Sequence, residues 1–561
     1  MKKKNIINKL IVAPLVMGFM SCTGNYMDIN SNPYQPGDLT PDDYALGSAM
    51  SNLASTVISS DVNTAQFTDC LLGGPLGGYF ADSNAGWSNT ISNFNATNDW
   101  TRVFLISDRI ISTLYGNLST VKQVSENTNN PVPYAIAQII KVAAMSRVTD
   151  AYGPIPYSKI GQDGKITIPY DTQEEVYNAF FKELDESIEV LTENRNAALV
   201  ASADFVYSGN VQKWVKFANT LRLRLALRVS NVDPALAQTQ AKAALTDPAG
   251  LMQSQDDNMK QTPKRQYIAG GNENIYALLF SWTGNAVLSK EMERAYKNQA
   301  LKEGAAADAV TFNENSENCY LDPRCEVLWF RPTPFDSLTT SPLPTENLKR
   351  DFNGVMNGET NVGGSYLNRY SANRCILSSD AMNKDYWWNL AREIVWMGYA
   401  ESLFLKAEAA LRWPSLVDET AEALYLKGIK ASMDYYEIDA DKANEYISHL
   451  DGVKAFAGGS KEEQLEQIIT QKWIAVFPNG NEGWAEVRRT DYPRYLLAPV
   501  NGNNSNGEVA SGKLIKRINY PNSESRNPNK PGNVNQGSRV WWDVTDTMND
   551  RGQWHTPNNF R

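Results

Sequence analysis

Residues 400–435 read AESLFLKAEAALRWPSLVDETAEALYLKGIKASMDY, and their spacing decides the fold. Apolar or small side chains recur every three or four residues in two runs: Ala400, Phe404, Ala407 and Leu411, then Leu424, Gly428, Ala431 and Tyr435. This spacing places each run on one face of a helix. Trp413-Pro414 separates the runs, because proline cannot continue a helix. The stretch therefore predicts a helical hairpin whose small residues allow the two backbones to approach closely.

The same spacing recurs earlier in the chain. It predicts a helix over 134–150 that ends at Tyr152-Gly153-Pro154, a second helix after the cap Asp171-Thr172, and a third over 211–230. Such hairpins resemble tetratricopeptide units, in which each pair buries its apolar stripe against its neighbours. Their spacing is irregular here. We therefore expect a mainly α scaffold with little β structure, carrying hairpins within about 99–230 and 395–477.

The chain changes character between about 250 and 395, where Gly, Asn, Pro and Thr interrupt short apolar runs. Long insertions of this kind usually carry function. The sequence thus predicts one domain over 22–561, with a ligand-binding, loop-rich insertion at about 250–395. Residues 1–21 precede this domain as a signal peptide.

The first 22 residues have the pattern of a lipoprotein signal. Lys2, Lys3 and Lys4 precede an apolar stretch, Leu10–Met20, that is too short to span a bilayer. Small Ser21 followed by Cys22 resembles a bacterial lipobox, in which the cysteine sulfur is acylated. More than one acyl chain makes such an attachment durable. We expect Cys22 to be lipidated and the protein to be held at a membrane.

Charge and composition exclude several classes of function. The formal charge is −10, from 53 basic and 63 acidic residues, and no stretch is strongly basic, so a nucleic-acid partner is not expected. Only His449 and His555 are present, and neither has a second His or Cys at ligand spacing. We predict no metal site, no cofactor and no His-based catalytic triad.

The other four cysteines leave one question open. Cys319 and Cys325 could close a short disulfide loop, but spacing does not reveal the required geometry. Cys70 and Cys375 are expected to be buried free thiols.

Several short motifs follow one another from residue 28 to residue 493. They are DINSNP (28–33), RVTDAYGPIPY (147–157), GNVQKWVKFANTLRLR (209–224), DPR (322–324), FLKAEAALR (404–412), ITQKW (469–473) and EGWAEVRRTDYP (482–493). In this order they resemble the SusD/RagB family of outer-membrane nutrient-binding lipoproteins of Gram-negative bacteria.

The resemblance implies a helical fold with tetratricopeptide-like hairpins. It also implies nutrient capture beside a SusC-like, TonB-dependent transporter, with the lipid-anchored protein facing the exterior of the outer membrane. The motifs themselves fit a structural role. We expect ion pairs between Arg222, Arg224 and Arg228 on one side and Glu408, Glu482 and Glu486 on the other. Trp214, Trp473 and Trp484 are expected to pack between helices.

Glycan sites combine aromatic faces with amides, carboxylates or guanidinium groups, and the first segment of this kind is residues 71–100. Its Gly-rich turns are predicted to present Tyr79, Phe80, Asn84 and Trp87 to ligand. An aromatic residue after the first long helix commonly contributes to ligand binding in the resembled family, and Trp87 falls in that zone. Packing of Trp87 beneath its own loop is the alternative.

The second such segment is the insertion itself. Tyr366-Leu367-Asn368-Arg369-Tyr370 combines two rings with polar groups within five residues. From this region we predict Trp282, Tyr366, Asn368 and Tyr370 as ligand contacts; Tyr267, Trp329 and Phe335 are further aromatic candidates.

Alternative functions stay open at this point. A peptide or protein-fragment receptor of the RagB type would use a groove and the same rings. A module that only grips the transporter is another possibility. A glycoside hydrolase needs a paired set of carboxyl groups, one with a raised pKa. No motif singles out such a pair, so we name no catalytic residue and expect a binding protein.

Overall fold

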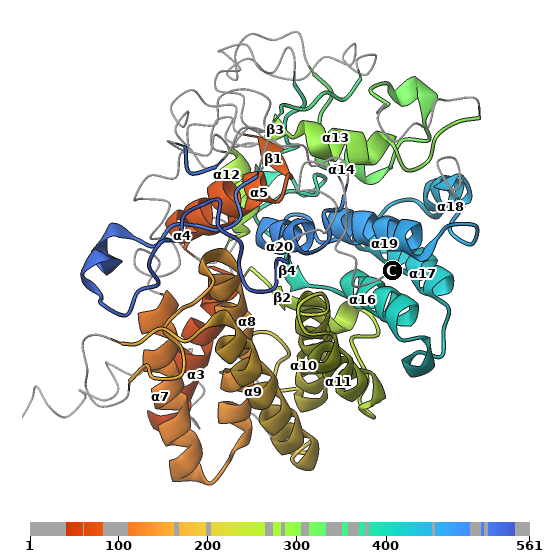
Figure 1. The fold of residues 1–561 in the computed structure, drawn as a ribbon. Helices are drawn as coiled ribbons and strands as arrows, with labels where there is room; N and C mark the ends of the chain where they lie inside the picture. The colour runs from red at the N-terminus through yellow and green to blue at the C-terminus, as the bar shows by residue number, and fades with distance from the viewer. Residues whose placement is uncertain are drawn as a thin grey trace, which may run out of the picture.

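The computed structural model describes fourteen stretches of the chain. They are residues 41–59, 61–81, 110–161, 168–197, 203–263, 273–281, 287–303, 313–332, 351–356, 370–375, 381–450, 455–493, 507–509 and 514–544. Helices dominate these stretches, and the strands are few and short, as expected for a mainly α scaffold (Figure 1).

The N-terminal helices pack in chain order: α3 (Pro41–Ser55), α7 (Ile110–Thr128), α8 (Val132–Tyr152), α9 (Gln173–Glu193), α10 (Val211–Arg228) and α11 (Pro234–Thr246). Figure 1 shows them side by side in its lower half. Their ends follow local signals. Thr172 and Glu175 form a capping box at the start of α9, Asn210 caps α10, and Gly153 adopts a positive φ of 82° after α8. The three helices expected in this region are confirmed.

The second helical group is α16 (Tyr399–Arg412), α17 (Ala421–Tyr435), α18 (Ala440–Ser448), α19 (Lys461–Ala475) and α20 (Gly480–Thr490). Helices α16 and α17 form the hairpin predicted from residues 400–435. A Cβ atom placed on Gly428 would lie 2.8 Å from Cε1 of Phe404. The absence of a side chain at this position therefore permits the close approach that the small residues predicted.

The remaining elements are short. The helical segments are α4 (Val62–Ala65), η1 (Gln66–Gly73), α5 (Gly74–Leu76), η6 (Gln255–Asp257), α12 (Ile275–Ser281), α13 (Lys290–Lys297), η7 (Ser316–Asn318), α14 (Arg324–Leu328), η10 (Pro414–Leu416) and η12 (Asn522–Arg526). Strand β1 (Phe80–Ala81) pairs antiparallel with β3 (Val287–Leu288), and β2 (Met259–Gln261) pairs antiparallel with β4 (Ile394–Met397). Trp387 and Trp388 are buried in a non-helical bend before β4.

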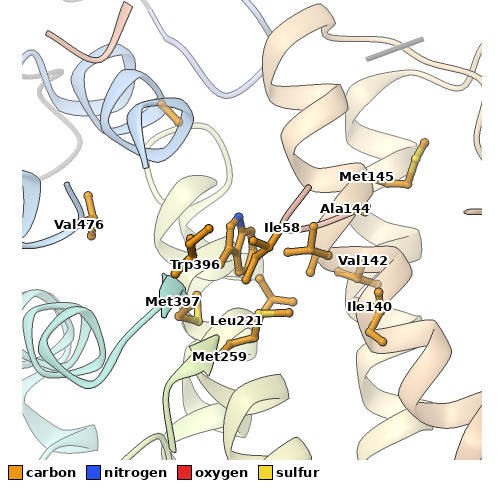
Figure 2. Packing of buried hydrophobic residues seen from close by; sticks show 14 of the residues in the cluster. Ile58, Ile140, Val142, Ala144, Met145, Leu221, Met259, Trp396, Met397 and Val476 are labelled. Carbon is orange, nitrogen blue, oxygen red and sulfur yellow. The ribbon is translucent and has the colours of Figure 1, made fainter. Parts of the chain in front are cut away.

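The two helical groups meet at an apolar seam. Figure 2 shows Trp396 and Met397 of β4, Met259 of β2 and Leu221 of α10 close together, with Val142 and other side chains of α8 beyond them. All are at most 7% exposed. Burying a large apolar side chain stabilises a fold by about 1.5–3 kcal/mol, so this seam holds the groups together.

The four cysteines of the described chain, Cys70, Cys319, Cys325 and Cys375, are buried and free. Cys319 and Cys325 thus form no disulfide, and the prediction for Cys70 and Cys375 is confirmed. Within the stretches given above, no helix has the combination of length and apolar character that crossing a membrane requires.

Candidate functional site

Arg and Glu residues of the sequence motifs form an ion-pair network in the core. Arg228 donates to Glu486 and Glu482 at 2.6 Å each, and Arg489 contacts Glu408 and Glu486 at 2.7 Å. The predicted pairing of Arg228 with Glu482 and Glu486 is confirmed. Glu408, however, pairs with Arg412 and Arg489, and these contacts, like the rest of the network, lie within the fold.

Two of the predicted arginines have other main partners. Arg224 forms its short contact, 2.6 Å, with Glu401 and lies 3.7 Å from Glu482. Arg222 pairs with Asp185 at 3.1 Å. The tryptophans expected between helices, Trp214, Trp473 and Trp484, are at most 3% exposed.

The electrostatics of this network fit a structural role. Burial opposes ionisation of Glu482, but Arg224, Arg228 and Lys472 outweigh it and lower its pKa to about 2. The pKa of Glu486 is lowered as well, because Arg489, Lys472 and Arg228 overcome its burial. Both glutamates are therefore ionised at neutral pH and tightly paired.

Asp150 differs, because burial raises its pKa although Arg228 opposes the shift. It accepts hydrogen bonds from Tyr177 Oη at 2.6 Å and Trp542 Nε1 at 2.8 Å. The cavity beside it measures about 20 Å³, which is room for about one water molecule. A sugar ring cannot reach this carboxyl group.

The glycine-rich segment that was expected to present Tyr79 and Phe80 is packed in the core. A Cβ on Gly77 would lie 2.5 Å from the carbonyl oxygen of Gly480, and one on Gly480 would overlap the carbonyl of Gly73. These glycines therefore allow η1 and α5 to touch the start of α20 backbone to backbone, rather than forming exposed turns.

Tyr79 and Phe80 are consequently both 0% exposed. Tyr79 Oη donates to the Trp473 carbonyl at 2.6 Å, and the Phe80 ring lies 5.2 Å from that of Phe280. The prediction that these two rings contact ligand is corrected: in this structure both pack the core.

Beside them lies a small β arrangement, here called the β1–β3 frame and made of Phe80–Ala81, Val287–Ser289, Val355, Phe330 and Ser371–Asn373. Ala81 pairs with Val287, Val287 bridges Ala372, and Ser289 bridges Val355. The Phe330 amide donates to the Ala372 carbonyl at 2.8 Å. The frame thus joins five separate segments of the sequence.

The candidate ligand residues belong to stretches that join the described chain at this frame. Ala81 precedes the stretch with Asn84 and Trp87, Val287 follows the stretch with Trp282, and Tyr370 follows the stretch with Tyr366 and Asn368. These five candidates, together with Tyr267, Phe335 and Cys22, lie outside the described residues. The structure therefore brings together the described residues that flank these three stretches.

Tyr370 is the predicted contact that the structure does place on the frame with partial exposure. It is half-buried and packs, as Phe330 does, against the cluster of Ala81, Val287, Val355 and Ala372. Trp329, the neighbouring candidate, is instead 0% exposed.

Two further residues complete a half-exposed group, here called the ring cluster: Phe330, Tyr370, Tyr386 and Arg374. The rings of Phe330 and Tyr386 meet edge to face, with centroids 5.9 Å apart and an interplanar angle of 86°. The Arg374 guanidinium lies 4.7 Å from the Phe330 ring centre. Sequence reasoning missed Tyr386 and Arg374, because no local pattern links them to Phe330.

The ring cluster offers the chemistry that sugars require. Aromatic faces can cover C–H surfaces, tyrosine hydroxyls can donate and accept hydrogen bonds, and a guanidinium offers several donors in one plane. Half-buried rings on a rigid frame lose little conformational freedom on binding. The cluster is therefore a candidate ligand-contact surface.

Comparisons with known proteins point to one family. The sequence profile described as "SusD-like: Susd and RagB outer membrane lipoprotein" matches residues 28–297, 318–458 and 453–551. None of the proteins with curated descriptions matches the sequence.

Solved structures agree in fold. A SusD homologue from Bacteroides uniformis is 49% identical, with a TM-score of 0.75, over 90% of this chain and 100% of that one. A chitin-binding SusD homologue from Flavobacterium johnsoniae is 29% identical, with a TM-score of 0.70, over 89% and 98% of the two chains. A SusD homologue from Bacteroides thetaiotaomicron has the same identity, TM-score and coverage.

Proposed function

Because the chain belongs to the SusD-like family of outer membrane lipoproteins, we propose that it captures a nutrient glycan and delivers it to a SusC-like, TonB-dependent transporter. The observation that carries the proposal is the β1–β3 frame, which lies beside a half-exposed ring cluster. The stretch with Asn84 and Trp87, the stretch with Trp282, and the stretch with Tyr366 and Asn368 each join the described chain there. A relative that is 29% identical is described as chitin-binding, which supports a glycan as the ligand class.

The proposed role is binding without catalysis. Hydrolysis of a glycosidic bond requires an accessible acid with a raised pKa opposite a second carboxylate. Asp150 is a described carboxyl group with a raised pKa, and its cavity has room for about one water molecule. The ionised glutamates of the core network are paired with Arg and Lys and do not face a ligand-sized space.

Lipidation at Cys22 would complete this function. A binder that does not transform its ligand is useful only when the captured ligand stays near an importer. Tethering through acyl chains raises the local concentration of bound ligand at the membrane surface. Replacement of Cys22 by serine should release the protein from the outer membrane while leaving glycan affinity unchanged.

Binding of the soluble chain, without residues 1–22, to a combined glycan and peptide array tests the ligand class. We expect hits among oligosaccharides, confirmed by calorimetry with the purified sugar. Binding restricted to peptides would favour the RagB-like alternative. Turnover of a bound glycan by the purified protein would overturn the non-catalytic role.

A further inference from the structure

Arg374 follows the frame residue Asn373 and is held by two backbone carbonyls of α14. Its backbone amide donates to the Leu328 carbonyl at 3.1 Å, and its Nε donates to the Glu326 carbonyl at 2.6 Å. The guanidinium lies 4.7 Å from the Phe330 ring centre. The two hydrogen bonds and the contact with the Phe330 ring fix the direction of the Arg374 side chain in the absence of ligand.

The terminal N–H groups of this guanidinium have no acceptor among the described residues, and no carboxylate there pairs with it. Its surroundings make the charge costly. Burial lowers the pKa of Arg374, and although Tyr386 and Glu326 oppose this shift, the nearby Arg331 adds to it. Glu326, the carboxylate that opposes this shift, pairs with Arg331 at 3.3 Å. Among the described residues, Arg331 thus has a carboxylate partner and Arg374 has none.

A second arginine of the chain, Arg392, has a similar ring contact but also has a carboxylate partner. Arg392 lies 3.8 Å from the Trp387 ring centre, so it is stacked in the same way. Its Nη1, however, donates to the Glu437 carboxylate at 2.8 Å. The two sites share ring stacking and differ in the presence of a protein carboxylate.

From this difference we infer that the ring cluster binds an acidic glycan, and that the Arg374 guanidinium pairs with a carboxylate or sulfate group on one of its sugars. Arginine suits such groups because two parallel N–H donors match two anionic oxygens. The Phe330 and Tyr386 rings then contact the body of the sugar. The inference rests on the proposed glycan-binding function and narrows its ligand class.

Calorimetry with matched oligosaccharides tests the inference. The ligands are oligogalacturonides, their uncharged methyl esters, and a sulfated and a desulfated neutral oligosaccharide of equal length. We expect the wild-type protein to bind at least one charged ligand about tenfold or more tightly than its uncharged match, since one paired charge is worth roughly that much. The carboxylate and sulfate series show which anion is preferred.

Arg374→Gln should abolish most of this preference, because it should weaken the binding of charged ligands far more than the binding of their uncharged matches. Arg374→Lys, which keeps the charge without the planar donors, should retain part of it. Arg392→Gln is the matched control and should retain all of it. Thermal melting of each variant confirms that the fold is intact.

The possible results distinguish the acidic-glycan inference from the proposed function. If the wild type binds uncharged glycans as well as charged ones, or if Arg374→Gln and Arg392→Gln behave alike, the inference is overturned while the proposed function stands. If the wild type binds only uncharged oligosaccharides on the glycan array, the inference alone fails. If it binds neither these ligands nor any oligosaccharide on the array, both the inference and the proposed function fail.

Discussion

At the scale of single residues, Glu486 shows how the core tolerates charge. Its carboxylate contacts Arg228 at 2.6 Å, Arg489 at 2.7 Å and Lys472 at 3.3 Å, and the side chain is 2% exposed. Removing one partner from such a cluster leaves buried cations without compensation. The ion pairs therefore favour one arrangement of the helices, since another arrangement would leave these buried charges without partners.

Glu486→Gln should lower the free energy of unfolding by about 3–5 kcal/mol, because Arg228 and Arg489 lose an ionised partner. The midpoint of urea unfolding measures the effect. Glu126→Gln is the control: Glu126 lies 3.9 Å from Lys122, and both side chains are more than half exposed. This control should change stability by less than about 1 kcal/mol. Equal shifts for the two variants would contradict a stabilising network.

The lowered pKa values of Glu408, Glu482 and Glu486 predict acid lability. The unfolded chain binds protons near pH 4.5, the ordinary glutamate pKa, whereas the folded chain holds Glu482 ionised to about pH 2. Stability from these groups is complete above about pH 5 and is lost as the pH falls toward 2. Thermal melting should thus show a steady midpoint above pH 5 and a steep decrease below it; an unchanged midpoint at pH 3 would contradict the prediction.

At the scale of helices and loops, several glycines let neighbouring elements approach more closely than a side chain would allow. Gly428 of α17 faces Phe404 of α16, while Gly73, Gly77 and Gly480 let η1, α5 and α20 touch along their backbones. The first contact was predictable from the small residues of the hairpin. The second was not, because the same residue type also favours exposed turns.

Gly428→Ala should destabilise the protein by about 1–3 kcal/mol, because its new methyl group would lie 2.8 Å from Cε1 of the buried Phe404 ring. Gly116→Ala in α7 is the matched control, since nothing lies within 4 Å of its added Cβ. There the better helix propensity of alanine should add up to about 1 kcal/mol. Thermal melting should move the two midpoints in opposite directions; a rise for both variants would rule out the close contact.

At the scale of the whole molecule, the structure gathers distant segments around the β1–β3 frame. Residues 80–81, 287–289, 330, 355 and 371–373 meet there, on the side of α20 away from the N-terminal helices (Figure 1). The helical scaffold thus supports one region from which the insertion and the 82–109 stretch both depart. We propose that the ligand-contacting segments extend from this base.

Trp87→Ala should weaken glycan binding by about tenfold while leaving the melting temperature unchanged, because we propose that its ring contacts ligand rather than the core. Calorimetry with the oligosaccharide identified on the array measures the affinity. Phe80→Ala provides the contrast: it removes a ring that is 0% exposed and should cost about 3–5 kcal/mol of stability. Unchanged affinity in Trp87→Ala would remove this residue from the proposed site.

The sequence by itself determined the helices and their ends, because periodicity, the Thr172 and Asn210 caps and Gly153 act over a few neighbouring residues. It also determined the family through ordered motifs. Only the tertiary structure decided that Tyr79 and Phe80 are core and that Glu408 pairs with Arg489. It also decided that Arg374 lies over the Phe330 ring, with no carboxylate partner among the described residues. These contacts join residues distant in the chain, so their outcome depends on how whole helices pack.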